Sequence, residues 1–482
     1  MDIRTRRLLE APLMPTLARL ALPNVLVMLV QSSIGLIETY FVAGLGTDAL
    51  AGMALVFPLL MLVQMVSAGG MGGGILSAVS RSLGAGRQAE AGLLAWHAVA
   101  LAVGLGLATS VLALGLGPFL YGLMGGTGAS LAAASAYSGV VFSGAVLLWL
   151  FNALSAVIRG TGNMVLPALV MCVGAVVLIP LSPALIFGWG PFPRLGIAGG
   201  GYAVVAYYAA GSAVFAAYLW SGRGVLRPQP SIPRLTWAPS REILRIGALS
   251  ALSAATTNVT IIAVTGFVGA AGPGAVAGYG TGARLEYLLV PLVFGLGSPV
   301  AAIVGTALGA GAVGRARQAA WTGALVAGLL TEVIGLAAAW HPTAWLGLFG
   351  QDPQFLTTGS LYLRIVGPFY GLFGFGLALY FAGQGAGRVG WPLVASILRM
   401  AVSLGGAWLA LAFGFGLPGI FAALASGLVA MGVVNAAAYA RGSTIPLPSP
   451  TEQPGLGAPI GSGSGEAPGR DHLHSVQTGT VR

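Results

Sequence analysis

The hydrophobic pattern of this chain consists of long apolar runs separated by short polar or glycine-rich gaps. A helix that crosses a bilayer needs about 20 mostly apolar residues. The apolar runs predict about twelve membrane-spanning helices, over residues 20–45, 50–80, 92–118, 132–158, 164–188, 196–221, 242–268, 275–308, 317–340, 355–383, 391–414 and 418–440. The predicted fold class is therefore an all-α polytopic membrane protein, with both termini on the same side.

Two polar segments divide the chain. SGRGVLRPQPSIPRLTWAPSREILR, at 221–245, is the longest polar break and carries several prolines, which disfavour helix. The residues beyond Arg441 are rich in Pro, Gly and Ser, a composition typical of disordered tails. We therefore predict five parts: an N-terminal segment 1–19, a six-helix bundle 20–221, a linker 222–241, a second six-helix bundle 242–440, and a disordered tail 441–482.

The two halves contain related motifs at a nearly constant separation. Leu83 and Leu308, each in an LGAG turn, are 225 residues apart, and so are Gly160 in RGTG and Gly385 in QGAG. The spacing predicts a duplicated six-helix unit. Two units with an even number of helices have the same orientation and are related by a pseudo-two-fold axis along the membrane normal, and such repeats place a substrate cavity at their interface.

Composition and charge support a place in the membrane. The chain is 56% hydrophobic and 7% charged, whereas about a quarter of a soluble domain is charged. Its basic residues are all arginines, and most lie in alternate gaps, at Arg81, Arg87, Arg159, Arg223, Arg227, Arg234, Arg241, Arg245, Arg315, Arg317 and Arg388. By the positive-inside rule these gaps and both termini are predicted cytoplasmic. The net charge of +10 is thus explained without a nucleic-acid partner.

A carboxylate lies deep in the first predicted helix. Asn24, Gln31 and Glu38 recur every seven residues and therefore share one helix face. A charge at mid-bilayer costs about 2.5–3.5 kcal/mol on insertion scales, so it faces protein or water. Because burial favours the protonated form of an acid, we predict that Glu38 is the cation-coupling residue and that Asn24 and Gln31 line a hydrated cavity. A purely structural hydrogen bond between helices is the alternative.

The second half offers no equivalent acid. Shifting the stripe by 226 residues gives Ser250, Thr257 and Val264, so coupling is predicted in the first half only, with Thr257 as a cavity candidate. Arg284 and Glu286 are also cavity candidates. They are two residues apart on one helix and cannot pair with each other, so each must find another helix or the cavity.

Other polar and proline residues in the predicted helices have plainer interpretations. Glu332 is predicted to be structural, and Arg399 is expected to extend its charged end toward the membrane interface. Pro23 and Pro291 interrupt helical hydrogen bonding and are predicted conformational hinges. The single cysteine, Cys172, has no His or Cys neighbours at metal-ligand spacing. Without a Walker motif, triad or metal cluster, no enzyme activity and no cofactor or metal site are predicted.

The residues resemble a known family. The segment LALPNVLVMLVQSSIGLIETYFVAGLGTDALAGMAL, the turns LGAG and RGTGN, and LFG-D…YLRIVGPFY, in that order, resemble multidrug and toxic compound extrusion (MATE) transporters over residues 14–440. The resemblance implies two six-helix bundles around a V-shaped cavity. It also implies export of amphiphilic, often cationic compounds in exchange for H⁺ or Na⁺, by a monomer in the bacterial inner membrane.

Particular positions carry the resemblance further. It implies that Glu38 is the family's helix-one acid, Gln31 a cavity glutamine, Pro23 the helix-one proline and Asn152 a cavity asparagine on helix four. Many bacterial members have an Asn and an Asp on helix five where this chain has Leu178 and Ser182. A Na⁺ site of several carboxylates is therefore incomplete, which favours H⁺ as the coupling ion.

Two other function classes remain as alternatives. A flippase for a lipid-linked precursor, from the same wider superfamily, needs several cations lining its cavity, and Arg284 is one candidate. A membrane enzyme or scaffold needs convergent polar groups at one membrane depth, and the sequence has none with catalytic spacing.

Overall fold

The computed structural model describes residues 2–231 and 233–447, except for the side chains of residues 28, 29 and 31–36. The predicted tail 441–482 lies outside this part of the chain from residue 448 onward. Within the described residues the regular secondary structure is helical throughout. All twelve predicted spans are occupied by helices.

The first half of the chain forms the N-terminal bundle, which we define as α2–α9. A short helix, α1 (Ile3–Glu10), precedes it. The bundle consists of α2 (Leu13–Ala43), α3 (Thr47–Gln64), α4 (Gly72–Gly84), α5 (Gln88–Leu123), α6 (Gly128–Ser143), α7 (Ala145–Gly160), α8 (Val165–Phe187) and α9 (Ile197–Trp220). A π-helical stretch, Met65–Met71, joins α3 to α4 and makes them one span.

The second half forms the C-terminal bundle, α10–α17. Its helices are α10 (Trp237–Gly269), α11 (Pro273–Gly309), α12 (Val313–Trp340), α13 (Pro342–Leu346), α14 (Pro353–Val366), α15 (Tyr370–Gly385), α16 (Gly390–Ala412) and α17 (Gly416–Ala440). A 3-10 turn, Gly367–Phe369, connects α14 to α15. Because α10 begins at Trp237, the end of the predicted linker 222–241 is helical.

Length and composition qualify these helices for a bilayer. In the described part of the chain ten spans are long and apolar enough to cross a membrane, and the pair α6–α7, bent by 48°, makes an eleventh. The remaining span is α2, which contains the residues whose side chains are not described. Large apolar side chains point outward, including Val111, Ile262 and Leu329, which are 71%, 72% and 69% exposed. Lipid, rather than water, suits such a surface.

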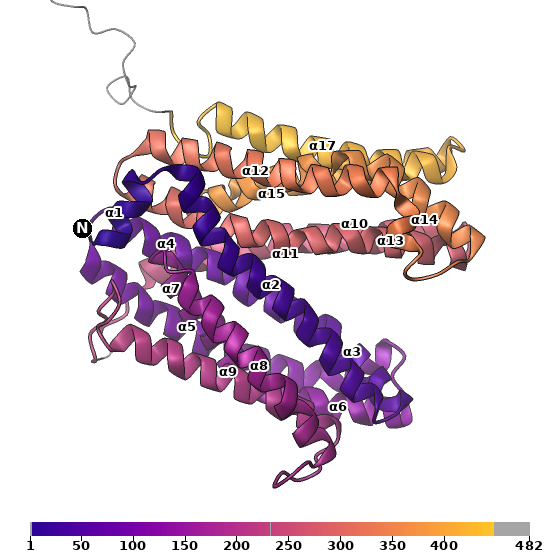
Figure 1. Cartoon of the computed structure of the whole chain (residues 1–482), viewed down its shortest axis with the longest axis horizontal. Coiled ribbons are helices and arrows are strands. Elements are labelled where there is room, and N and C mark those ends of the chain that lie inside the picture. The colour runs from indigo at the N-terminus through magenta and orange to yellow at the C-terminus, as the bar shows by residue number, and fades with distance from the viewer. Residues whose placement is uncertain (1, 232, 448–482) are drawn as a thin grey trace, which may run out of the picture. The chain divides into compact units, whose positions relative to one another are not determined.

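The two bundles meet at one end and diverge toward the other. Figure 1 shows them joined where α1 and α4 lie, and apart where α3, α6 and α14 lie. The small helix α1 contacts both bundles at the joined end. Arg4 donates a 3.1 Å hydrogen bond to the Tyr218 hydroxyl on α9, and Arg315 on α12 donates to the carbonyls of Leu8 and Ala11.

The crossing of α4 and α11 shows the two-fold relationship directly. Gly84 packs against the backbone of Thr306, and Gly309 packs against the backbone of Arg81. Both Gly84 and Gly309, and Arg81 and Thr306, are 225 residues apart. Reciprocal contacts of this kind arise across a two-fold axis. The predicted duplication and its pseudo-two-fold arrangement are therefore confirmed.

Candidate functional site

Glu38 lies inside the N-terminal bundle with a single neutral partner. The half-buried carboxylate accepts a 3.1 Å hydrogen bond from the Tyr137 hydroxyl of α6. Gly200 of α9 lies close to the same carboxylate oxygen, because a Cβ there would be 3.4 Å from it. Among the ion pairs of the described residues, none involves Glu38. An acid without a cationic partner is free to exchange a cation with solvent.

A small cavity separates Glu38 from α8. Its volume of about 10 Å³ has room for roughly one water molecule. Leu178 and Ser182, the two positions at which this chain departs from many MATE sequences, line it together with Glu38. The Ser182 hydroxyl is buried and has no hydrogen-bond partner. The departure therefore lies directly beside the candidate coupling acid.

A polar network continues through the N-terminal bundle. The Asn152 side-chain nitrogen donates to the Gln64 side-chain oxygen at 2.9 Å and to the Ser67 hydroxyl at 2.8 Å. Gln64 in turn donates to the Tyr208 hydroxyl at 2.9 Å. Asn152 was a predicted cavity residue, whereas Gln64, Tyr137 and Tyr208 were not predicted. Gln64 and the two tyrosines occur singly in apolar runs, and no periodic pattern marks them.

The predicted stripe on α2 divides between two surroundings. The side-chain nitrogen of Asn24 lies 3.5 Å from the Gly295 carbonyl of α11, so Asn24 contacts the opposite bundle. Glu38 is 14 residues further on, about 21 Å along the helix, and faces its own bundle. Gln31 belongs to the residues whose side chains lie outside the description. Of the described pair, the structure does not bring Asn24 to Glu38.

An ion pair occupies the interior of the C-terminal bundle. Arg399 of α16 and Glu286 of α11 lie 2.5 Å apart, and Glu286 also accepts a 3.2 Å hydrogen bond from the Tyr362 hydroxyl. The Arg399 guanidinium is 5.2 Å from the centroid of the Phe373 ring. The expectation that Arg399 extends to the membrane interface is wrong, because the residue is only 6% exposed. The sequence could not show that its partner lies on another helix.

The remaining predicted residues stand apart from these clusters. Arg284 is exposed and Thr257 half-buried, and neither forms a hydrogen bond or ion pair within the described part of the chain. Pro23 and Pro291 lie within α2 and α11, each of which continues as a helix past its proline. Glu332 accepts a 2.6 Å hydrogen bond from the backbone nitrogen of Gly371 at the start of α15.

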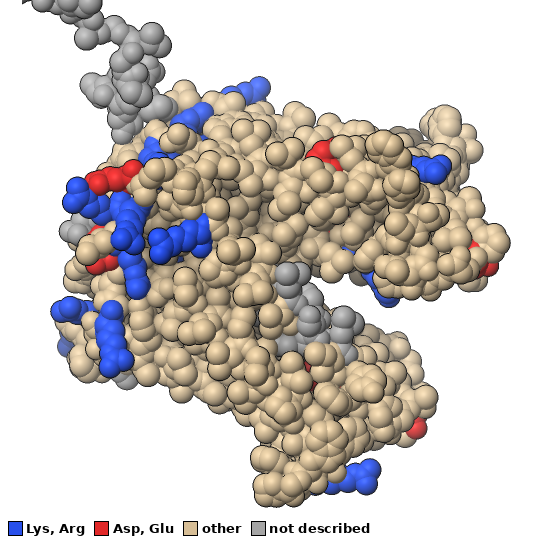
Figure 2. All heavy atoms as spheres, in the orientation of Figure 1, with Lys and Arg blue, Asp and Glu red and all other residues tan. Residues whose placement is uncertain are grey.

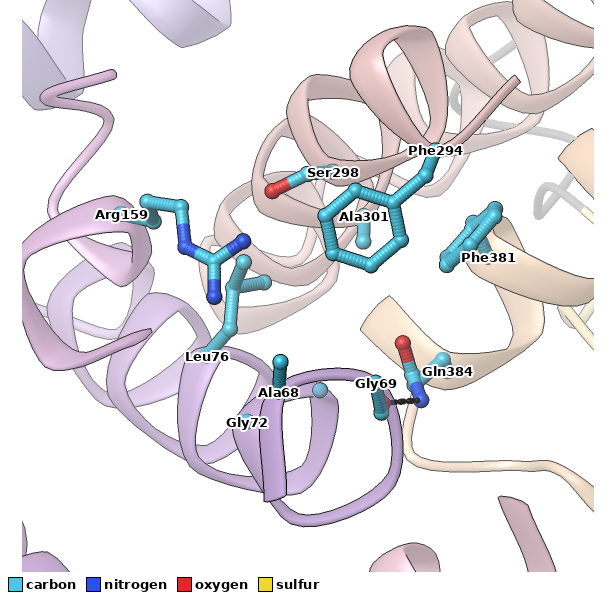
Figure 3. Close-up of a pocket in the computed structure, with 11 residues that line it drawn as sticks. Ala68, Gly69, Gly72, Leu76, Arg159, Phe294, Ser298, Ala301, Phe381 and Gln384 are labelled. Carbon is cyan, nitrogen blue, oxygen red and sulfur yellow. Dashed lines mark hydrogen bonds between the residues drawn. The ribbon is translucent and has the colours of Figure 1, made fainter. Parts of the chain in front are cut away.

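Arg159 departs from the place given to it by the charge pattern. It was counted among the cytoplasmic gap residues, but it is the penultimate residue of α7 and only 7% exposed. Its repeat equivalent, Gln384, lines the same cavity between the bundles (Figure 3). The 225-residue offset was the sequence signal that could have paired them.

A cleft opens between the two bundles. In Figure 2 it is visible as a deep notch, and the arginines gather mainly at the end where the bundles are joined. Within the described residues no three His, Cys, Asp or Glu side chains are grouped as metal ligands. The chemistry of the site therefore rests on isolated buried charges beside a cleft.

Comparison with known sequences identifies relatives over most of the chain. The MatE family model matches residues 23–184 and 250–409. The FAD transporter of Shewanella oneidensis is 30% identical over 370 residues, covering 76% of this chain and 81% of that protein. A probable multidrug resistance protein NorM of Thermotoga maritima is 25% identical, covering 80% and 82% of the two chains.

Solved structures share the fold. A crystal structure of a MATE protein in a bent conformation superposes with a TM-score of 0.84 at 23% identity, covering 91% of this chain and 97% of that chain. A MOP superfamily transporter of Pyrococcus furiosus gives a TM-score of 0.82 at 23% identity, with coverage of 91% and 98%. These similarities extend through both bundles.

Proposed function

Because this chain belongs to the MatE family of efflux transporters, we propose that it is a secondary active antiporter that exports small amphiphilic or cationic compounds in exchange for H⁺. Several relatives are named multidrug resistance proteins, which supports a broad cargo range. The membrane-spanning fold and the cleft between the bundles suit a carrier that binds its cargo between two repeats.

Glu38 is the observation that carries the proposal. Its carboxylate lies within the bundle, has the Tyr137 hydroxyl as its hydrogen-bond partner and adjoins a cavity large enough for a water molecule. An ionised carboxylate in this setting is costly, so uptake of a proton offsets the cost of burial. Release of that proton to water on the other side would make the protonation state follow the conformation.

The surroundings of Glu38 favour H⁺ over Na⁺. A hard metal cation is held by several oxygen ligands. Leu178 supplies no oxygen, and Ser182 supplies one hydroxyl. A proton needs only the carboxylate itself. We therefore assign the coupling role to H⁺.

Alternating access would follow from the way the bundles are joined. In this structure the cleft is open at the end opposite the arginine-rich end (Figure 2). With the arginines cytoplasmic, the cleft faces outward and both termini are cytoplasmic. Rocking of the bundles about the glycine crossing of α4 and α11 would open the other side.

An anionic cargo is the second candidate, because a relative covering most of the chain is named an FAD transporter. Such a cargo, or the lipid-linked precursor of a flippase, requires cations facing the cleft. Arg284 is exposed and unpaired within the described residues, whereas Arg399 is neutralised by Glu286. A single available arginine favours the first candidate.

Transport into everted membrane vesicles tests the proposal. A lipophilic cation dye should accumulate when a pH gradient is imposed, and Glu38→Gln should abolish that accumulation. Asp48→Asn, which neutralises an exposed acid at the start of α3, is the matched control and should transport normally. Gradient-driven uptake that persists in Glu38→Gln would remove Glu38 from coupling. Uptake of FAD instead of the dye would favour the second candidate.

A further inference from the structure

A guanidinium group without a partner lies in a small cavity between the two bundles. Arg159 is 7% exposed, and its Nε is buried without a hydrogen-bond acceptor. The guanidinium forms no hydrogen bond or ion pair with the described residues. Figure 3 shows it directed toward a space walled by Ala68, Gly69 and Leu76 on one side and by Phe294, Ser298, Phe381 and Gln384 on the other.

The charge on Arg159 is not compensated by the surrounding side chains. Its guanidinium carbon lies 5.6 Å from the centroid of the Phe294 ring, which gives a cation–π contact. Such a contact returns only part of the free energy lost when a cation leaves water. Buried cations in proteins are ordinarily paired with an anion, so the remaining cost points to a missing counter-ion.

A second unused donor faces the same space. The Ser298 hydroxyl on α11 is 4% exposed and has no hydrogen-bond partner, and Figure 3 shows it pointing toward Arg159. The amide nitrogen of Gln384 is engaged elsewhere, since it donates to the Gly69 carbonyl and to the Ser250 hydroxyl, each at 3.0 Å. Two convergent donors, one of them charged, are the complement of a single anion.

The cavity lies on the pseudo-two-fold axis. Arg159 and Gln384 are repeat equivalents, 225 residues apart, and so are Gly73 and Ser298, which also line the cavity. An exact duplicate would place two arginines face to face, and their charges would repel each other. This chain keeps one arginine and carries glutamine at the other position. The site therefore presents a single positive charge.

We propose that Arg159 and Ser298 bind one small anion of the size of chloride between the two bundles. The cavity volume of about 10 Å³ suits one water-sized particle, so phosphate, sulfate and a flavin are too large. Because α4 and α7 supply one wall and α11 and α15 the other, the bound anion stabilises the arrangement in which the bundles are joined. The proposal is independent of the exported compound and of the coupling ion.

Thermal unfolding of the purified full-length protein tests this site. The melting temperature is measured in sodium chloride, bromide, phosphate and gluconate at equal ionic strength. Chloride and bromide should raise the melting temperature by a few degrees in a saturable manner, and phosphate and gluconate should not. Arg159→Gln should lose the halide response, whereas Arg364→Gln, which removes an exposed arginine of α14, should keep it.

Two further measurements keep the test decisive if Arg159→Gln fails to fold. Ser298→Ala should weaken the apparent halide affinity severalfold while the Arg159 charge is retained. Crystals grown in bromide should show anomalous density beside Arg159. Equal melting temperatures in chloride and gluconate, or a halide response that Arg159→Gln preserves, would show that the cavity holds water only and would overturn the proposal.

Discussion

Arg399 and Glu286 form an ion pair 2.5 Å long between α16 and α11, in the interior of the C-terminal bundle. Tyr362 donates to the same carboxylate and in turn accepts from Tyr370 at 3.5 Å. Both charged side chains are mostly buried, with 7% and 15% of their side-chain surfaces exposed. The pair therefore lies where an uncompensated charge is expensive, and it makes the C-terminal bundle electrically different from the N-terminal one.

Removing one partner of this pair should destabilise the protein strongly. Arg399→Met leaves the Glu286 carboxylate buried without a counter-ion and should cost about 3–5 kcal/mol. The double variant Glu286→Met, Arg399→Met replaces both charges and should recover most of that loss. Chemical denaturation in detergent measures both. A single variant as stable as the double one would show that the pair is not coupled.

Close packing at the helix crossing should be sensitive to one methyl group. A Cβ at Gly84 would overlap the backbone of Thr306, so Gly84→Ala should cost about 1–3 kcal/mol and slow transport. Gly104→Ala, on α5 where a Cβ meets nothing within 4 Å, is the control and should be neutral or stabilising by about 0.5–1 kcal/mol. Equal stability of the two variants would mean that α4 and α11 do not approach closely.

Glu332 should behave as a structural residue. Its carboxylate accepts the 2.6 Å hydrogen bond of the Gly371 N–H where α15 starts after the 3-10 turn. Glu332→Leu removes the acceptor and should cost about 1–3 kcal/mol, whereas Glu332→Gln retains an oxygen and should cost less. Proton-coupled transport should persist in Glu332→Gln. Its loss in a variant that still folds would give Glu332 a part in coupling.

Added ligands beside Glu38 should change the ion preference. Leu178→Asn with Ser182→Asp places an amide and a second carboxylate in the cavity that Glu38 lines. Two carboxylates in one site attract a metal cation, so transport by this variant should become stimulated by Na⁺. Dye uptake with Na⁺ or choline outside measures the change. The matched variant Leu178→Asn alone should remain insensitive to Na⁺.

The orientation in the membrane can be tested with engineered cysteines in a Cys172→Ser background, since Cys172 is the only cysteine. Arg223 lies between α9 and α10 and Gln351 before α14, and both are exposed. Intact cells treated with an impermeant maleimide should label Gln351→Cys. Arg223→Cys should react only after permeabilisation, and labelling in intact cells would reverse the proposed topology.

Local signals predicted the helices better than their partners. Every apolar run of sufficient length became a helix, because the backbone has no other way to satisfy its hydrogen bonds in lipid. The start of α10 was placed at 242 instead of Trp237, since the segment before it is polar and proline-rich. Arg159 and Arg399 were misplaced for a related reason. Their burial depends on residues far away in sequence, which hydropathy does not reveal.

By itself, the sequence determined the membrane-spanning helical class, the internal duplication and the buried acid at Glu38, because hydropathy, spacing and charge are properties of contiguous residues. Only the tertiary structure decided that Glu38 meets Tyr137 and Ser182, that Glu286 pairs with Arg399, and that Arg159 remains without a counter-ion. Each of these depends on how helices distant in the chain pack around one another. The energy of a buried charge is set by those neighbours, whose approach no local pattern encodes.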